Sequence, residues 1–180
     1  MNEALQARHF VVLPQFITQL RAQALAKSLS QHFENAPPSS DTTVPGAPAV
    51  YDFLPFVRLL VEKIPQVESV SEEKVLPTYS YARLYGHGQA LRLHQDRDAC
   101  ELSLTLNLDG DEVWPIWLKT PSGEAVSVRQ QPGDAVMYLG CQTPHWREPF
   151  DGQFCSQVFL HYVFAHGARS HAYFDKQRFR

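Results

Sequence analysis

From Val75 onward, apolar and polar residues alternate over short runs that are rich in β-branched and aromatic side chains. Alternation with a period of two is the pattern of a half-buried β-strand. Turn-forming residues separate the runs, and both Asp109-Gly110 and Pro132-Gly133-Asp134 stand where a hairpin is expected. Roughly six to eight short strands in a row predict a sandwich or a jelly-roll barrel.

The part of the chain before these strands is expected to be mainly helical. Its elements are, in order, a short strand within His9–Phe16, a helix over 16–33, a Pro- and Ser-rich loop over 34–50 and a second helix over 51–64. We therefore expect a mostly β (α+β) fold in one domain over residues 1–180. Its helical part spans about 1–70 and its jelly-roll core about 75–166, with the helices packed on one sheet.

Composition excludes several classes of protein. Lys and Arg number 16 against 19 Asp and Glu, a balance that argues against a nucleic-acid surface. No apolar run is long enough to cross a bilayer, and no basic stretch precedes one, so we expect neither a membrane span nor a secretory signal. The three cysteines form no C-x-x-C pair, which is typical of reduced thiols in a cytoplasmic protein. The oligomeric state cannot be inferred from these features.

A candidate metal site begins in "LRLHQDRDAC". If this stretch is extended, His94 and Asp96 face the same side, so the imidazole and the carboxylate converge. The best third ligand is His145, which follows a predicted strand and a tight turn. Two histidines and one carboxylate on one face leave coordination positions open, as in non-haem Fe(II) oxygenases. An H-x-D triplet alone is weak, because it arises often by chance.

The surrounding residues form a longer motif. In "YGHGQALRLHQD", Tyr85, Gly88 and Leu91 precede the H-x-D pair. In "QPGDAVMYLGCQTPHWREP", a Gly-Asp turn leads through a strand to the distal histidine and then to Pro149. Together with the opening "HFVVLPQFI", and over most of the chain, this pattern resembles the prolyl 4-hydroxylase-like branch of the Fe(II)/2-oxoglutarate dioxygenases.

The resemblance implies a double-stranded β-helix core in which His94, Asp96 and His145 hold Fe(II). It also implies 2-oxoglutarate as a chelating co-substrate that leaves as succinate and CO2, O2 as the oxidant, and ascorbate as an optional reductant. Tyr85 matches the family tyrosine that hydrogen-bonds the distal carboxylate of 2-oxoglutarate. Hydroxylation of an unactivated C–H is the usual outcome. Halogenating relatives lack the carboxylate ligand, so the presence of Asp96 favours hydroxylation.

The sequence departs from the family at the anchor for the distal carboxylate. Relatives place an Arg or Lys about ten residues after the distal histidine, because a planar cation suits a carboxylate. Here Cys155 stands at that position. The first candidate for a relocated anchor is Arg147, two residues after His145, and the second is Arg83, two residues before Tyr85. The third is Lys119, which closes "WPIWLK". Gln157 is a neutral hydrogen-bond donor close to the usual anchor position. For each cation, a solvated surface charge is the competing interpretation.

A second departure is the short segment after Asp96. Only "RDA" separates it from Cys100, whereas peptide-modifying relatives often have a longer loop that folds over the substrate. Residues 36–50 are an alternative cover, or a passive linker. Arg97 is a weaker candidate for a substrate contact, and His161 is expected to be a buried histidine with satisfied hydrogen bonds.

The leading prediction is a dioxygenase that acts on a small-molecule or peptide substrate: a peptidyl-proline, an amino acid or a biosynthetic intermediate. The alternative from another class is a metal- or ligand-binding jelly-roll module of the cupin kind without oxygenase turnover. A zinc hydrolase with the same three ligands is a third hypothesis, and it requires a general base such as Glu148 or Glu101.

Overall fold

Strands with one apolar face and one polar face build most of the molecule. The computed structural model describes residues 1–35 and 43–179, the last four of these by their backbone alone. The described strands are β1 Phe10–Leu13, β2 Ala49–Tyr51, β3 Val75–Gly86, β4 Leu91–His94, β5 Leu102–Gly110, β6 Ile116–Lys119, β7 Ala125–Val128, β8 Ala135–Tyr138, β9 His145–Arg147 and β10 Phe154–Phe164.

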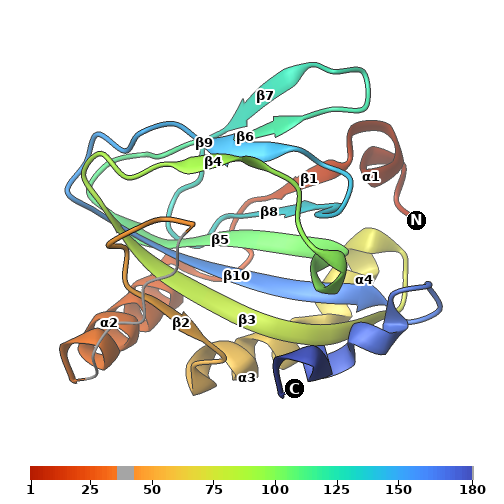
Figure 1. The fold of residues 1–180 in the computed structure, drawn as a ribbon, viewed down its shortest axis with the longest axis horizontal. Coiled ribbons are helices and arrows are strands. Elements are labelled where there is room, and N and C mark those ends of the chain that lie inside the picture. Colours follow the sequence, from red (N-terminus) through yellow and green to blue (C-terminus); the bar gives the residue numbers. More distant parts are fainter. Residues whose placement is uncertain (36–42, 180) are drawn as a thin grey trace.

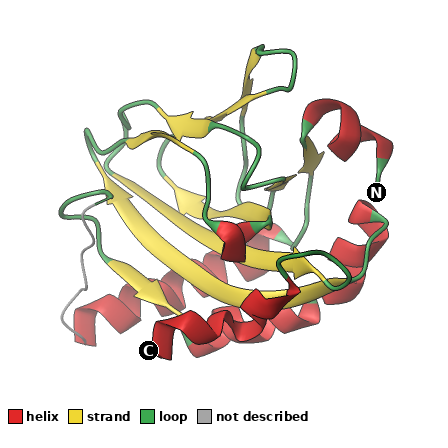
Figure 2. Ribbon diagram, turned by 45° about the vertical axis from the view of Figure 1, so that its right-hand side comes forward, coloured by secondary structure: helices red, strands yellow, loops and turns green. Residues whose placement is uncertain are grey.

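These strands form two antiparallel sheets that face each other (Figure 1). The larger sheet has the order β1-β8-β5-β10-β3-β2, and the smaller sheet has the order β4-β9-β6-β7. Helices cover the outer face of the larger sheet, whereas no helix of the described residues covers the outer face of the smaller sheet (Figure 2). The predicted mostly β fold, with helices packed on one sheet, is confirmed.

The structure contains helices that the sequence analysis did not predict. They are α1 Glu3–Arg8, α2 Gln19–Asn35, α3 Leu54–Glu62 and α4 Ile64–Ser71, with 3-10 turns at η1 Asp98–Cys100 and η2 Ser170–Phe179. The first predicted helix begins later than expected because Thr18 accepts a hydrogen bond from the Arg21 amide, as an N-cap residue does. The second ends near Lys63, and Pro65 lies in the first turn of the unpredicted α4. None of the described helices combines the length and apolarity that crossing a membrane requires.

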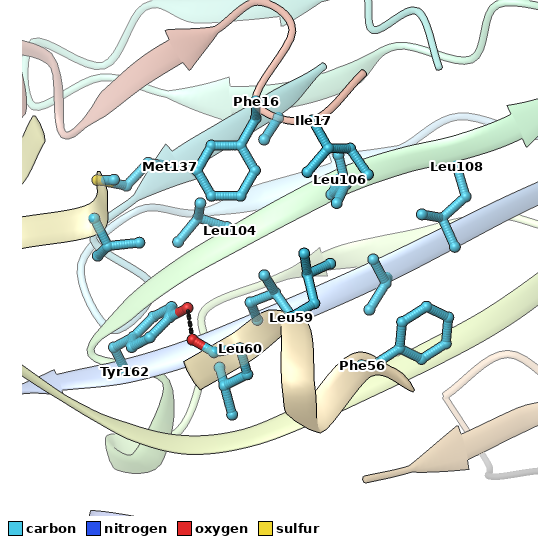
Figure 3. Close-up of a cluster of buried hydrophobic side chains, with 14 of the residues drawn as sticks. Phe16, Ile17, Phe56, Leu59, Leu60, Leu104, Leu106, Leu108, Met137 and Tyr162 are labelled. Carbon is cyan, nitrogen blue, oxygen red and sulfur yellow. Dashed lines mark hydrogen bonds between the residues drawn. The ribbon is translucent and has the colours of Figure 1, made fainter. Parts of the chain in front are cut away.

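β5 shows how the sequence divides the two sides of the larger sheet. Leu104, Leu106 and neighbouring leucines are fully buried against the helices, in a cluster that includes Phe16, Phe56 and Leu59 (Figure 3). Each such side chain contributes roughly 1.5–3 kcal/mol through burial. The alternate residues, Ser103 and Thr105, face the space between the sheets and are equally buried. Buried polar side chains require hydrogen-bond partners, so this inner face marks a specialised interior.

Neither predicted hairpin turn joins two paired strands. β5 pairs with β10 and β8 in the larger sheet, whereas β6, which follows Asp109-Gly110, pairs with β7 and β9 in the smaller sheet. Pro132-Gly133-Asp134 likewise lies between β7 and β8, which belong to different sheets. The hairpin predictions were wrong because consecutive strands of this jelly roll cross between layers. A hairpin does join β6 to β7, through a turn in which Gly123 adopts a φ of 89°.

Candidate metal centre

The two candidate histidines lie opposite each other on paired strands. β4 and β9 are antiparallel neighbours, and their register places His94 directly across from His145. The centres of the two imidazole rings are 4.2 Å apart. Asp96 follows β4 in a loop, and its Oδ1 lies 3.7 Å from Nε2 of each histidine. Ligand atoms of all three residues lie within 4.8 Å of one another, so the structure brings the predicted trio together.

Backbone carbonyls fix the tautomer of both histidines. Nδ1 of His94 is 2.8 Å from the Arg92 carbonyl oxygen, and Nδ1 of His145 is 2.9 Å from that of Thr143. A carbonyl only accepts, so each Nδ1 carries a proton, and Nε2 is the nitrogen of each ring that faces Asp96 Oδ1. Burial lowers the pKa of His145 to about 4, which keeps its imidazole neutral at physiological pH. Neutral imidazole is the form that binds a metal.

Asp96 is positioned by tertiary contacts instead of strand pairing. Its amide donates to the Gly140 carbonyl at 2.9 Å, and its Oδ2 accepts from the Ser103 hydroxyl at 2.8 Å. A Cβ atom at Gly140 would lie 2.5 Å from that same Oδ2 and 2.2 Å from the Cys100 carbonyl oxygen. Only glycine therefore allows this close approach of backbone to carboxylate. Ser103 belongs to no motif recognised in the sequence, and Gly140 lies within the quoted segment before His145 without a role assigned to it there.

A cavity of about 250 Å³ extends from the candidate ligands. Six of the residues that line it come from β3 and β10: Tyr79, Tyr81, Arg83, Tyr85, Phe159 and His161. Tyr85, the predicted partner of 2-oxoglutarate, is buried and packs edge-to-face on Trp114. Arg97 also lines the cavity, where its guanidinium lies over the Tyr79 ring and pairs with the buried Asp175.

Arg147, the first-ranked anchor, is a buried cation on the inner face of β9. Its side chain is 1% exposed and lies over the Trp114 ring. It donates to the Trp114 carbonyl oxygen and, from Nη2, to Thr105 at 3.2 Å and Gln130 at 3.0 Å. Gln157 Oε1 lies 3.5 Å from the same Nη2. The structure thus places Arg147 against Gln157 on β10, in the region where the family resemblance predicts the anchoring group.

The surroundings of Arg147 are neutral. Among the residues that the structure describes, none with an acidic side chain forms an ion pair with it, and its Nε has no hydrogen-bond partner. A buried charge without a counterion is costly, so the site is suited to an anion. Arg147 itself does not line the cavity, whereas Arg83 does; Arg83 is also buried and donates to Tyr81.

Other predicted residues lie elsewhere. Lys119 is exposed on the outer face of the smaller sheet, beside the stacked Trp117 and Trp146, and is not among the residues that line the cavity. Glu101 pairs with Arg169, and Glu148 accepts from Trp146; neither lines the cavity as a hydrolytic base would. The loop considered as a cover falls partly, at 36–42, outside the described residues.

A second group of potential ligands shares Asp96 with the first and adds Cys100 and His161. Burial raises the pKa of the Cys100 thiol, whose sulfur lies 3.0 Å from the Tyr79 hydroxyl, so this group offers a protonated thiol. His161 is buried, and its Nδ1 is engaged by Ser103, as expected for a satisfied core histidine. The trio of His94, Asp96 and His145 therefore fits a metal better.

Solved structures that resemble this chain include several oxygenases. A Pseudomonas putida prolyl-4-hydroxylase matches with a TM-score of 0.74 and 16% identity, over 90% of this chain and 96% of that one. HygX from Streptomyces hygroscopicus, with nickel, 2-oxoglutarate and hygromycin B bound, matches with a TM-score of 0.72 and 13% identity, and the match covers 90% of this chain and 85% of HygX. The α-ketoglutarate-dependent carbocyclase SnoK from nogalamycin biosynthesis matches with a TM-score of 0.75 and 12% identity, and the match covers 89% of this chain and 81% of SnoK.

At these identities the likeness establishes the fold. The chain has the jelly-roll fold of the Fe(II)/2-oxoglutarate-dependent oxygenases, which confirms the predicted fold. Its resemblance to the prolyl 4-hydroxylase-like branch extends from the sequence motif to the three-dimensional structure. No protein-family model matches the sequence, and no curated protein matches it either. Structures of this fold include a hydroxylase and a carbocyclase, so the reaction has to be argued from the site.

Proposed function

We propose that this protein is a non-haem Fe(II)- and 2-oxoglutarate-dependent dioxygenase that hydroxylates an unactivated C–H and releases succinate and CO2. The observation that carries the proposal is the geometry of the trio. Two imidazoles whose Nε2 atoms each lie 3.7 Å from one carboxylate oxygen form a set of ligands on one face. Such a set suits Fe(II) and leaves positions open for co-substrates.

His94, Asp96 and His145 would hold the metal. Bound Fe(II) would supply the centre at which 2-oxoglutarate and O2 react. The protein contributes a pre-oriented pair of imidazoles and a carboxylate held by Gly140 and Ser103. Because these side chains are fixed before the metal arrives, little reorganisation accompanies binding.

Arg147 is the group we assign to the distal carboxylate of 2-oxoglutarate, with Tyr85 as a hydrogen-bond donor. Support comes from the burial of Arg147, the absence of an acidic partner among the described residues and its contact with Gln157. A dianionic co-substrate would supply the missing counter-charge. Arg83, which lines the cavity two residues before Tyr85, is the competing anchor.

The substrate group that enters this site is proposed to be small. The cavity of about 250 Å³ is below the roughly 300–1,000 Å³ of typical ligand pockets, and 2-oxoglutarate would occupy part of it. Its walls are rich in tyrosine. Three kinds of substrate meet this size limit if only a small group enters the cavity: a peptidyl-proline, a free amino acid and a biosynthetic intermediate.

Anaerobic titration tests the proposal without knowledge of the substrate. Apo-protein is titrated with Fe(II) and then with 2-oxoglutarate, and the visible charge-transfer band of chelated 2-oxoglutarate is recorded. The proposal predicts a saturable band that succinate does not produce. Iron binding without a band would favour the jelly-roll binding module, because that alternative requires no 2-oxoglutarate.

A further inference from the structure

The two oxygens of the Asp96 carboxylate have different surroundings. Oδ1 faces both candidate histidines at 3.7 Å from each Nε2. Oδ2 accepts a hydrogen bond from Ser103 Oγ at 2.8 Å. The Gly140 backbone is packed so closely that a Cβ there would lie 2.5 Å from Oδ2. Oδ2 is therefore enclosed by protein, whereas Oδ1 faces the metal centre.

His161 orients the hydroxyl that holds Oδ2. Ser103 is fully buried, and its Oγ lies near three groups: Asp96 Oδ2, His161 Nδ1 at 2.9 Å and the Cys100 carbonyl oxygen at 3.1 Å. The hydroxyl has one hydrogen, and the nearer, charged carboxylate is the stronger acceptor. His161 then donates its Nδ1–H to Oγ, and its ring is kept in place by Tyr79 at a centroid distance of 4.5 Å. A chain of donors runs from His161 through Ser103 to Asp96.

This chain has a consequence for the number of open metal positions. A carboxylate that binds through both oxygens takes two positions, and one that binds through a single oxygen takes one. With two histidines and a one-oxygen carboxylate, three positions of an octahedral ion stay open, enough for a chelating 2-oxoglutarate and O2. With a two-oxygen carboxylate, the position for O2 is lost.

We propose that Ser103, oriented by His161, is a positioning residue that restricts Asp96 to one metal-binding oxygen and so keeps the O2 position open. The inference rests on the proposed function, because it needs Fe(II) and 2-oxoglutarate to occupy the site. The two residues to which it gives a role, Ser103 and His161, lie outside the sequence motifs. It also explains why β5 carries a serine at a fully buried position.

The test uses nitric oxide as a probe for the O2 position. Wild type and the Ser103→Ala and His161→Phe variants are loaded anaerobically with Fe(II) and 2-oxoglutarate, and nitric oxide is titrated while the resonance signal of the iron–nitrosyl complex is recorded. Thr78→Val is the matched control, since it removes a buried hydroxyl that donates to the Ala99 carbonyl oxygen on the adjacent turn. Fe(II) affinity and thermal stability are measured on every variant.

We expect Ser103→Ala to retain Fe(II) affinity, because the freed Oδ2 becomes a second metal ligand, while its affinity for nitric oxide falls by about tenfold or more. His161→Phe should show a smaller loss of the same kind, and it carries the test if Ser103→Ala does not fold. Thr78→Val should match wild type. Unchanged nitric oxide affinity in both variants would overturn the inference, as would a loss of Fe(II) affinity of the same size. If wild type itself binds no Fe(II) or 2-oxoglutarate, the proposed function has failed instead.

Discussion

The histidine side and the aspartate side of the candidate metal centre are built by different means. His94 and His145 sit on paired strands, and their rings are oriented by carbonyls only two residues away along the chain. Asp96 lies outside the strands, and the groups that hold it come from Ser103 and Gly140. One side depends on local backbone geometry, and the other depends on contacts between distant segments.

Ion pairs extend the aspartate side to the C-terminal segment. Arg97, directly after Asp96, pairs with Asp175, and Arg169 pairs with both Asp98 and Glu101. The segment after Asp96 is short, and in this structure η2 packs beside it (Figure 1). Metal affinity should therefore respond to changes far along the chain on the aspartate side, but only to nearby changes on the histidine side.

The largest effect is expected from Asp96→Ala. It removes the only charged ligand of the trio, so Fe(II) affinity should fall by more than the ~10–100-fold that lost supporting partners cost, and 2-oxoglutarate turnover should cease. Fe(II) titration and succinate formation measure both. Full turnover in this variant would show that the metal assignment is wrong.

Arg147→Ala should separate co-substrate binding from metal binding. Hydrogen bonds to a charged group contribute ~1.5–3 kcal/mol, so the 2-oxoglutarate affinity should fall about 10–100-fold while the Fe(II) affinity changes little. The charge-transfer titration gives both constants. Lys119→Ala, on the outer face of the smaller sheet, is the control and should behave as wild type. An unchanged affinity for 2-oxoglutarate would move the anchor to Arg83.

Gly140→Ala tests the close packing on the aspartate side. The added methyl group would meet the Cys100 carbonyl oxygen and Asp96 Oδ2, so we expect a stability loss of ~1–3 kcal/mol and weaker Fe(II) binding. Gly86→Ala is the matched control, because the atom nearest to a Cβ added at Gly86 would lie 3.8 Å away, at an ordinary contact distance. Denaturant unfolding and Fe(II) titration are the measurements. Equal behaviour of the two variants would refute the packing argument.

Asp175→Asn should have the smallest effect. The Asp175 side chain is 2% exposed but that of Arg97 is 47% exposed, so solvent screens the ion pair. We therefore expect the free energy of unfolding to fall by only ~1–2 kcal/mol. Fe(II) affinity should fall by less than about tenfold, since the segment after Asp96 is loosened and no ligand is removed. Asp98→Asn breaks a more exposed pair and should leave both quantities unchanged. If Asp175→Asn alters stability but not Fe(II) affinity, the C-terminal segment does not support the site.

Sequence reasoning succeeded where the pattern is local. Alternation in β3, β5 and β10 predicted strands, and the two-residue period correctly placed Arg147 on the same face as His145. It failed where partners are distant. The Asp109-Gly110 turn has hairpin chemistry, yet the choice of sheet depends on pairing with β10 and β8. Only the tertiary structure shows that Ser103 and Gly140 hold Asp96 and that Asp175 pairs with the neighbouring Arg97.

The most direct test of this account is a crystal structure grown anaerobically with Fe(II) and 2-oxoglutarate, with the metal located from its anomalous scattering. The account predicts one iron peak bonded to His94 Nε2, His145 Nε2 and Asp96 Oδ1, with the distal carboxylate of 2-oxoglutarate at Arg147. A peak between Asp96, Cys100 and His161, or 2-oxoglutarate away from Arg147, would contradict it.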